Sequence, residues 1–313
     1  MRILLVRLDG IGDAAVCIPL LASLRAAGHE IGVALTTRNA DLFAPDAIVA
    51  QHVLERIPWP AHGSTPETTA RARAEIAAAR YDAALIASEE PEAYALAAGI
   101  PLRIGFSTGW TRPLKTLWVR ARVTRAIARA QQPGAATLHE VEVLYRLGTG
   151  MVAAPQPPAA AAALRRMLAV TPVPPRSGIL FQAGPKWGAI GVDAAPLRAA
   201  LAALAPRGVR LVASPGDAAA VEAALGVAPE TFANLREWVA AIDAAAQVVT
   251  VDTGAAHVAG MLGVPVIDVF PDAGFAAQVR RWRPWASRFA ALRASEASGG
   301  GVARASEALA DGG

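Results

Sequence analysis

The stretch VRLDGIGDAA, residues 6–15, places a carboxylate where an apolar strand gives way to a helix. Gly10 and Gly12 let the backbone turn tightly, and a helix that begins near Asp13 presents unpaired N–H groups, which suit a phosphate or another anion. Asp13 can serve as the N-cap of that helix, or it can act as a general base at the mouth of a cleft. Asp9, which precedes the turn, is a second candidate base in the same loop.

Residues 10–15 also satisfy the G-x-G-x-x-A form of the dinucleotide-binding fingerprint. Two features disfavour a nicotinamide cofactor. The second strand ends in VALTTR, without an acidic residue for a ribose hydroxyl, and Asp13 would place negative charge where the pyrophosphate should lie. An oxidoreductase therefore stays only as an alternative, which binding of a nicotinamide dinucleotide without binding of ADP would support.

The stretch VTVDTGAAHVAG, residues 249–260, adds a hydroxyl and an imidazole to the same arrangement. The N-terminus of a helix carries about half a positive charge, and the amides of Thr253, Gly254 and the residues that follow can donate to a diphosphate. Gly254 lets such a ligand approach the backbone closely. The structural alternative is that Asp252 or Thr253 caps the helix and that His257 is an ordinary packed histidine.

The stretch LFQAGPKWGA places Lys186 after a third apolar strand and a Gly-Pro turn. A lysine there can neutralise a departing phosphate, a contribution of about 3 to 4 kcal/mol in a dry site. Alternatively, Lys186 lies in a solvated loop with its stem packed on Trp187.

These corners belong to an alternation of apolar runs and helical patterns, which is typical of parallel sheets covered by helices. The strands expected from the sequence are 2–8, 31–36, 82–88, 102–107, 178–183, 208–213, 247–251 and 265–270. The expected helices are 14–27, 66–80, 137–147, 194–205, 218–225, 235–245 and 254–262. The predicted fold class is α/β, with two tandem Rossmann-like, doubly wound domains. Because ligands bind beyond the carboxyl ends of such strands, we expect the two domains to face a central cleft.

The length of 313 residues favours two domains of about 150 residues each. We expect an N-terminal domain over residues 1–150 and a linker rich in proline and alanine over 151–176. A C-terminal domain over 177–290 follows, and the tail over 291–313 is expected to form at most one helix before it frays.

The composition is that of a soluble globular protein, with 54% hydrophobic and 18% charged residues and no run of 18 apolar residues. The first seven residues, MRILLVR, contain too short an apolar run for a signal peptide. A single cysteine, Cys17, excludes an internal disulfide, and no Cys or His cluster has metal-ligand spacing. We therefore expect a cytoplasmic protein without a bound metal.

A basic block runs from Arg103 to Arg129, with seven Arg or Lys residues and no Asp or Glu. Such a block needs an anionic partner or a solvated face. Basic residues interleaved with aromatic ones suit lipid headgroups at an anionic membrane, where each contributes about 1 kcal/mol. RNA is an alternative partner, but no nucleic-acid motif accompanies the block, and we expect none to bind. The residues concerned are Arg112, Lys115, Arg120 and Arg122, with Trp110 and Trp118 between them.

Five segments together resemble glycosyltransferase family 9, the ADP-heptose:lipopolysaccharide heptosyltransferases. The resemblance spans residues 1 to about 285, and D-T-G-x-x-H is its most specific part. The segments are MRILLVRLDGIGDAAVCIPLLASLR, RIGF, HEVEVLYRLG, the Lys186-Trp187 pair and ETFANLREWVAAIDAAAQVVTVDTGAAHVAGMLGVPVIDVF.

The resemblance implies the GT-B fold, inversion at the anomeric carbon and a nucleotide-sugar donor held mainly by the C-terminal domain. It makes Asp13 the candidate catalytic base, on a loop that Gly10 and Gly12 shape. At the donor diphosphate it places Lys186, Asp252, Thr253, Gly254 and His257. Near the nucleotide base and ribose it places Ser214, Gly216 and Asp217.

The predicted activity is transfer of a heptose from ADP-heptose to a lipopolysaccharide core acceptor of the lipid A-Kdo type. We expect a monomeric cytoplasmic enzyme, peripheral to the inner membrane, with a nucleotide sugar and an anionic glycolipid as partners and no obligatory cofactor. One alternative is a family 9 transferase that uses another nucleotide sugar or acceptor, such as a capsule sugar or a protein hydroxyl. Another is a catalytically inactive nucleotide- or lipid-binding module. After PVIDVF the chain continues with PDAGFAAQVRRWRPWAS instead of the family's Gly-Pro-Thr type of loop, which leaves the donor sugar open.

Overall fold

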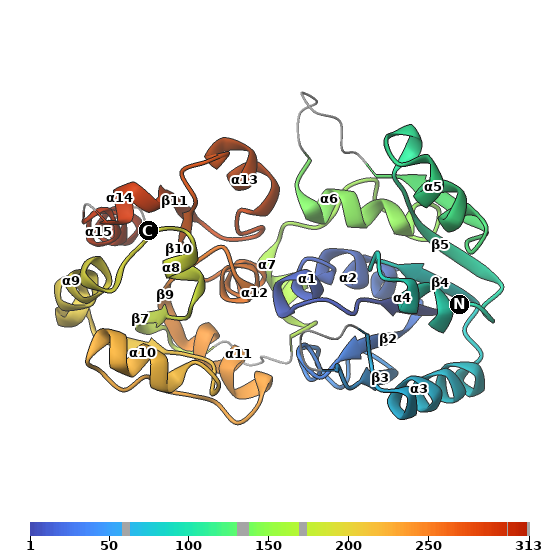
Figure 1. The fold of residues 1–313 in the computed structure, drawn as a ribbon, viewed down its shortest axis with the longest axis horizontal. Coiled ribbons are helices and arrows are strands. Elements are labelled where there is room, and N and C mark those ends of the chain that lie inside the picture. The colour runs from blue at the N-terminus through green and yellow to red at the C-terminus, as the bar shows by residue number, and fades with distance from the viewer. Residues whose placement is uncertain (58–62, 130–137, 169–173, 299, 312–313) are drawn as a thin grey trace. The chain divides into compact units, whose positions relative to one another are not determined.

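The computed structural model describes two compact α/β units, Met1–Pro158 and Ala159–Gly313 (Figure 1). The residues described are 1–57, 63–129, 138–168, 174–298 and 300–311. Part of the helix expected over 137–147 lies outside these ranges, as does part of the predicted linker.

Unit 1 is built on a six-stranded parallel sheet with the order β3-β2-β1-β4-β5-β6. Its strands are β1 (Arg2–Val6), β2 (Glu30–Thr36), β3 (Ala50–Leu54), β4 (Ala83–Ile86), β5 (Leu102–Ser107) and β6 (Arg125–Ala128). Its helices are α1 (Ile11–Ala15), α2 (Ile18–Ala26), α3 (Pro66–Ala79), α4 (Pro91–Leu96), α5 (Pro113–Arg120) and α6 (Glu140–Tyr145), with short 3-10 turns η1 (Gly109–Thr111) and η2 (Arg146–Gly148). Side chains from α3, α4 and α5 pack on one face of this sheet.

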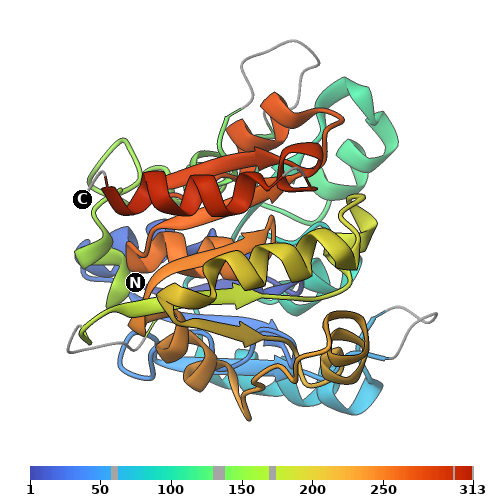
Figure 2. The same cartoon turned by 90° about the vertical axis from the view of Figure 1, so that its left-hand side faces the viewer.

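Unit 2 is built on a five-stranded parallel sheet with the order β11-β10-β9-β7-β8. Its strands are β7 (Ser177–Gln182), β8 (Val209–Val212), β9 (Ala245–Val251), β10 (Val266–Phe270) and β11 (Phe289–Arg293). Its helices are α7 (Ala161–Arg165), α8 (Lys186–Ala189), α9 (Ala194–Leu204), α10 (Ala218–Leu225), α11 (Leu235–Ala244), α12 (Gly254–Leu262), α13 (Phe275–Trp282), α14 (Ala294–Ser298) and α15 (Gly301–Asp311), with the 3-10 turn η3 (Ala205–Arg207). Figure 2 shows α9 and α15 over the near face of this sheet.

The strand order of each sheet reverses direction at one point, and this decides where the loops of interest lie. In unit 1 the reversal falls between β1 and β4, which pair side by side. In unit 2 it falls between β7 and β9. Ligands of open parallel sheets bind at such switch points, because the two adjacent loops leave in opposite directions and open a crevice. The loops after β1, β4, β7 and β9 are therefore the natural places for a site.

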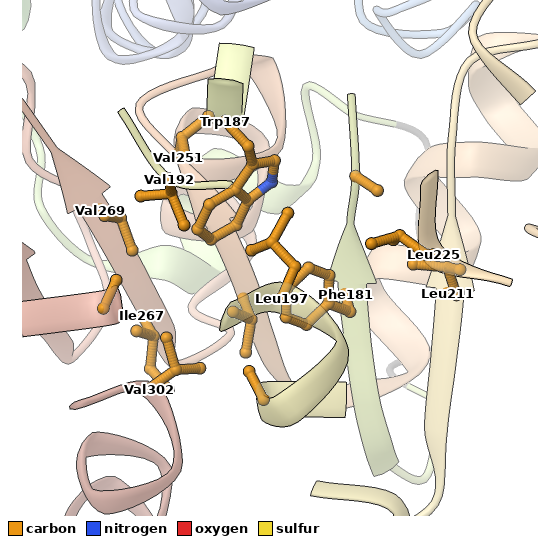
Figure 3. Close-up of a cluster of buried hydrophobic side chains, with 14 of the residues drawn as sticks. Phe181, Trp187, Val192, Leu197, Leu211, Leu225, Val251, Ile267, Val269 and Val302 are labelled. Carbon is orange, nitrogen blue, oxygen red and sulfur yellow. The ribbon is translucent and has the colours of Figure 1, made fainter. Parts of the chain in front are cut away.

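The core of unit 2 is formed by apolar side chains that alternate along the strands and meet α9 and α15 (Figure 3). Phe181 of β7 stacks on Trp187 of α8, with ring centroids 5.4 Å apart. Helix α12 is buried from Ala255 to Leu262. Its Gly260 is required by close packing, since a Cβ there would lie 2.9 Å from the backbone nitrogen of Trp285.

The segment predicted as a linker is divided between the two units, which separate between Pro158 and Ala159. Helix α7 is tied to unit 2 because Arg165 forms an ion pair with the fully buried carboxylate of Asp243 in α11. Arg176 donates to the same carboxylate over 3.1 Å. A buried charge must be paired in this way, so α7 and Arg176 pack as part of unit 2.

The structure differs from the predicted elements mainly at the edges. Strands β3, β6 and β11 were not predicted, and all three are short strands at sheet edges that are only partly buried. The helix expected over 14–27 is divided at Val16 and Cys17 into α1 and α2. In place of a frayed tail after residue 291, the structure has α14 and α15, and Ser306 of α15 contacts Gln247 of β9.

Candidate active site

The carboxylate of Asp13 lies at the switch point of unit 1 and is held from two sides. Arg7 Nη2 donates to Oδ1 over 2.6 Å, and the backbone N–H of Gly10 donates to Oδ2 over 3.3 Å. The Asp13 side chain is 36% exposed. Since an ionised carboxylate offers about four lone-pair sites, the remaining ones can accept a proton from a ligand. The structure thus gives Asp13 the fixed position and the access that a general base needs.

The expectation that Asp13 is the N-cap residue is corrected by the structure. The N-cap of α1 is Gly10, and Asp13 occupies the third helical position, from which it accepts the N-cap amide as the acidic half of a capping box. The φ of Gly10 is −82°, a value open to any residue, so backbone strain does not explain this glycine. Gly12 lies within α1. Its role in shaping the loop remains a proposal.

Arg7 is the residue that sequence reasoning missed in this corner. Its buried guanidinium contacts Asp13 and also Asp9, whose Oδ2 lies 3.1 Å from Nε. Burial by itself lowers the pKa of Arg7, but the acidic groups around it outweigh burial and the pKa is raised. Ser88, in the loop after β4, donates to the same oxygen of Asp9 over 2.6 Å. Arg7 and Ser88 thus hold Asp9 at one oxygen, and Asp13 stays the proposed base because the family resemblance assigns that role to it.

Cys17 gives a first prediction about this corner. It is the only cysteine of the chain and is fully buried behind Asp13. Burial, which outweighs the opposing effect of Arg7, raises the pKa of the Cys17 thiol to about 12. We expect a thiol reagent at neutral pH to leave the folded protein unlabelled and to label one thiol per chain in denaturant. Rapid labelling of the native protein would contradict this burial.

The basic residues predicted to meet the acceptor have different environments. Lys115 is half-buried and contacts Glu89, which also accepts from Arg129 over 2.6 Å. Burial alone would raise the pKa of Glu89, but hydrogen bonds from these two cations hold it below its usual value. Arg122 is exposed and lies over the ring of Trp118. Arg112 and Arg120 are exposed.

The second corner places Asp252, Thr253 and His257 at the start of α12, directly after β9. Thr253 is the N-cap by position, but its hydroxyl lies 2.9 Å from the hydroxyl of Thr250. Among the residues that the structure describes, no side chain accepts a hydrogen bond from the first turn of α12. The reading of Asp252 or Thr253 as a side-chain cap is therefore corrected. The amides of Ala256 and His257 donate to the carbonyl of Thr253, and those of Gly254 and Ala255 remain available to an anion.

Lys186 of α8 reaches the same corner across the switch point. Its ammonium donates to the backbone carbonyl of Asp252 and lies 3.4 Å from Oδ2 of that residue. The other oxygen of Asp252 lies 3.5 Å from Nε2 of His257. Burial tends to raise the pKa of Asp252, but His257 and Lys186 outweigh it and lower the pKa. Asp252 therefore orients the two cationic or polar groups on either side of it.

The alternative reading of Lys186 expected a solvated loop residue, and the structure places Lys186 in the short helix α8 with a partly exposed side chain. Trp187 is buried in the core of unit 2, where its indole N–H donates to the carbonyl of Gln182 over 2.9 Å. Lys186 remains 46% exposed and is held by Asp252. Its ammonium has three donors, and the contacts to Asp252 leave capacity for a ligand.

Two further residues at this corner were not found from the sequence. Trp282, in the segment that departs from the family pattern, has its ring centroid 5.8 Å from that of His257. The segment forms α13 and thus borders the start of α12. Asp268 of β10 is fully buried beside Thr250, its register partner in β9. A carboxylate inside the apolar strand PVIDVF was the signal available in the sequence.

Asp268 is a buried acid without a hydrogen-bond partner on either oxygen in the described part of the chain. Burial and the nearby charge of Asp252 raise its pKa well above the usual value, while Lys186 opposes this shift. A folded-state pKa above the unfolded value contributes stability at low pH, and this contribution is lost as the pH rises through the folded pKa. The folded-state pKa of Asp268 is raised because ionising a buried acid costs free energy.

We expect Asp268→Asn to become more stable relative to the wild type as the pH rises, by up to about 1.4 kcal/mol per pH unit. Urea unfolding at about pH 5 and about pH 8 measures the difference. Asp272→Asn is the control, because hydrogen bonds from Ser295 lower the pKa of Asp272. This carboxyl is therefore ionised in both the folded and the unfolded state from about pH 5 to about pH 8, and its replacement should give a stability difference that does not change with pH. A stability difference that does not change with pH would contradict an uncharged Asp268.

The residues proposed near the nucleotide lie in the loop after β8. Ser214 donates to Oδ2 of Asp217 over 2.6 Å, and Asp217 is the N-cap residue of α10. A Cβ at Gly184, two residues before Lys186, would lie 3.9 Å from the same oxygen. The structure thus brings the loops after β7 and β8 together, and Gly216 is exposed between them.

Within the described residues, no group of three or more His, Cys, Asp or Glu side chains has the arrangement of a metal site. None of the helices in those same ranges has the length and apolar character needed to cross a membrane.

A family model described as glycosyltransferase family 9 (heptosyltransferase) matches residues 69–305 of the chain. No curated protein matches it. Among solved structures, E. coli heptosyltransferase WaaC with ADP is 19% identical, with a TM-score of 0.72 over 99% of each chain. A family 9 glycosyl transferase from Veillonella parvula DSM 2008 is 17% identical, with a TM-score of 0.71 over 98% of this chain and 96% of that one. E. coli ADP-heptose lps heptosyltransferase II is 18% identical, with a TM-score of 0.65 over 99% of this chain and 98% of that one.

Proposed function

Because the chain belongs to glycosyltransferase family 9 and has the GT-B fold of these enzymes, we propose that it moves a heptose from ADP-heptose to a lipopolysaccharide core acceptor, with inversion. Membership in this family makes the protein a glycosyltransferase. The proposal names the donor, the acceptor and the residues that act on them.

One observation carries the donor part of the proposal. Lys186 and His257 meet at Asp252 beside the uncapped first turn of α12. A leaving nucleoside diphosphate gains negative charge as its bond to the sugar breaks, and amides together with an ammonium group stabilise that charge. The arrangement supplies both kinds of donor without an obligatory metal. The ADP in the structure of E. coli WaaC supports a nucleotide of this type.

In the proposed reaction, an acceptor hydroxyl attacks the anomeric carbon and its proton passes to the carboxylate of Asp13. The bond from that carbon to the diphosphate oxygen breaks, and the diphosphate leaves with the electron pair toward Lys186 and α12. Arg7 keeps the base in place through its 2.6 Å contact. The reaction requires an acceptor held by unit 1 to reach a donor held by unit 2. Gly254, without a side chain at the first helical position, favours a close approach of the diphosphate.

The acceptor part of the proposal depends on the basic block of unit 1. Arg112, Arg120 and Arg122 are exposed, and Lys115 lies beside them in α5. A phosphorylated glycolipid supplies the anionic groups that such residues bind. We propose a cytoplasmic, monomeric enzyme that works on the inner-membrane surface and binds no nucleic acid.

A nucleotide-binding panel followed by a transfer assay tests this function. We expect ADP to bind more tightly than UDP or GDP, and ADP-heptose to glycosylate a lipid A-Kdo precursor. Preference for UDP or GDP would overturn the donor assignment. Binding of ADP without transfer to any acceptor would instead favour an inactive nucleotide-binding module.

A different sugar or acceptor within the family is the second candidate. The observation that favours it is Trp282, whose ring lies against His257 in a segment that departs from the family pattern. A changed rim beside the diphosphate would change the space for the donor sugar. Transfer from another ADP-sugar at a higher kcat/KM than from ADP-heptose would support this candidate.

A further inference from the structure

Helix α5 of unit 1, which is labelled in Figure 1, carries two leucines that are exposed to solvent. Leu114 is 82% exposed and Leu117 is 65% exposed, the two highest values among large apolar side chains in the described residues. They are three residues apart and therefore lie on the same face of the helix, one turn from each other. Adjacent exposed leucines on one helix face form an apolar patch, which marks an interaction surface.

The leucines cannot turn inward, because the other faces of α5 are already packed. Thr116 and Val119 are buried against the sheet. Lys115 points to Glu89. The ring of Trp118 meets that of Tyr94 edge to face, with centroids 5.1 Å apart. The exposure of the leucines thus results from the fixed orientation of the helix.

Positive charge borders this apolar face. Arg120 lies beside the leucines on α5, Arg122 sits over the Trp118 ring at 3.9 Å, and Arg112 immediately precedes the helix. In the described part of the chain, neither Arg112 nor Arg120 forms an ion pair with a carboxylate. An apolar strip with basic margins is the pattern of a helix that lies in the interface of an anionic membrane.

We propose that α5 docks on an anionic lipid bilayer by placing Leu114 and Leu117 among the acyl chains, while Arg112 and Arg120 meet the headgroup phosphates. This inference rests on the proposed function, since it assigns the surface through which the enzyme reaches a glycolipid acceptor. It adds an apolar anchor to the headgroup contacts. A nucleic acid would use the arginines but would gain nothing from the leucines.

Co-sedimentation with mixed phosphatidylcholine–phosphatidylglycerol vesicles tests the surface. We expect the wild type to bind these vesicles and to bind pure phosphatidylcholine vesicles weakly. Leu114→Ser with Leu117→Ser should weaken binding by about tenfold or more, because each leucine loses most of its apolar burial. Arg112→Gln with Arg120→Gln should weaken it by about tenfold or more and reduce its salt dependence. Val227→Ser, at a 53% exposed apolar residue of unit 2, is the matched control and should bind as the wild type does.

A second readout locates the contact directly. Because Cys17 is buried and its thiol has a pKa of about 12, a cysteine introduced by Leu114→Cys would be the only reactive thiol. An environment-sensitive label there should shift to the blue on anionic vesicles, and the same label on Val227→Cys should not. Wild-type binding without a shift at residue 114 would place the membrane contact elsewhere and overturn the proposal.

Activity assays distinguish a failure of the proposed docking surface from a failure of the proposed function. The double serine variant, Leu114→Ser with Leu117→Ser, should bind ADP and glycosylate a deacylated, water-soluble acceptor as the wild type does. Loss of vesicle binding with these activities intact supports the docking surface. Equal vesicle binding by the wild type and the double serine variant, or no vesicle binding by the wild type, overturns it. Normal vesicle binding without any transfer would count against the proposed function alone.

Discussion

Asp13→Asn is expected to lower kcat by about 100- to 10,000-fold, the range that general base catalysis typically supplies. Asparagine has nearly the same size and can still accept the Gly10 amide, but it cannot take the proton of the acceptor hydroxyl. Affinity for the donor nucleotide should stay unchanged, because the proposed donor residues belong to unit 2. Steady-state transfer assays and calorimetric titration with ADP measure the two quantities.

Asp9→Asn is the matched control for this variant. Asp9 contacts the same buried guanidinium of Arg7 and, at 31% exposed, resembles Asp13 in accessibility. Both substitutions remove one carboxylate from Arg7, so both should lower the free energy of unfolding to a similar degree. Only the loss at Asp13 should remove the base. If the Asp9 variant loses as much kcat as the Asp13 variant, the loss reflects the shared guanidinium and the assignment of the base is wrong.

Lys186→Met is expected to lower kcat by about 100- to 1,000-fold, as for the loss of one preorganised donor to a developing negative charge. The variant should also bind a nucleoside diphosphate more weakly. A nucleoside monophosphate lacks the second phosphate, and its affinity should change less. The preference for ADP over AMP therefore decreases in the variant, which competition binding measures.

Lys186→Arg serves as the control because it retains the positive charge and changes only the shape of the cationic group, from an ammonium to a planar guanidinium. It should keep more of the ADP preference than the methionine variant does. The free energy of unfolding should change little in either variant, since Lys186 is 46% exposed while its neighbour Trp187 carries the packing. An unchanged ADP-to-AMP preference in Lys186→Met would contradict a role at the diphosphate.

The central strands of both sheets follow directly from the sequence, whereas three of the four edge strands, β3, β6 and β11, do not. β1, β4, β9 and β10 are buried on both faces, so their apolar runs are continuous and easily found. β6, with the sequence RAIA, lies at an edge inside a basic block and carries no such signal. An edge strand pairs with only one neighbouring strand, and the local sequence does not show which strand that is.

The residue types at the two corners were also available from the sequence, because a strand followed by glycine and a helix is a local pattern. Their partners were not. Lys186 and Asp252 are 66 positions apart, and their contact depends on β7 pairing with β9. Arg7 directly follows the apolar residues of β1, and its role becomes apparent only when the structure places Asp9 and Asp13 around it. Asp268 likewise acquires a raised pKa only through its burial in the folded sheet and the nearby charge of Asp252.

By itself, the sequence determined the alternation of strands and helices, the family and the two corners where chemistry can occur. These depend on periodicity, on small residues and on short-range turns, all of which act over a few positions along the chain. Only the tertiary structure decided which charges are paired, which amides remain uncapped and which leucines stay in water. These properties depend on distance and on access to solvent, which parallel pairing creates between segments far apart in the chain.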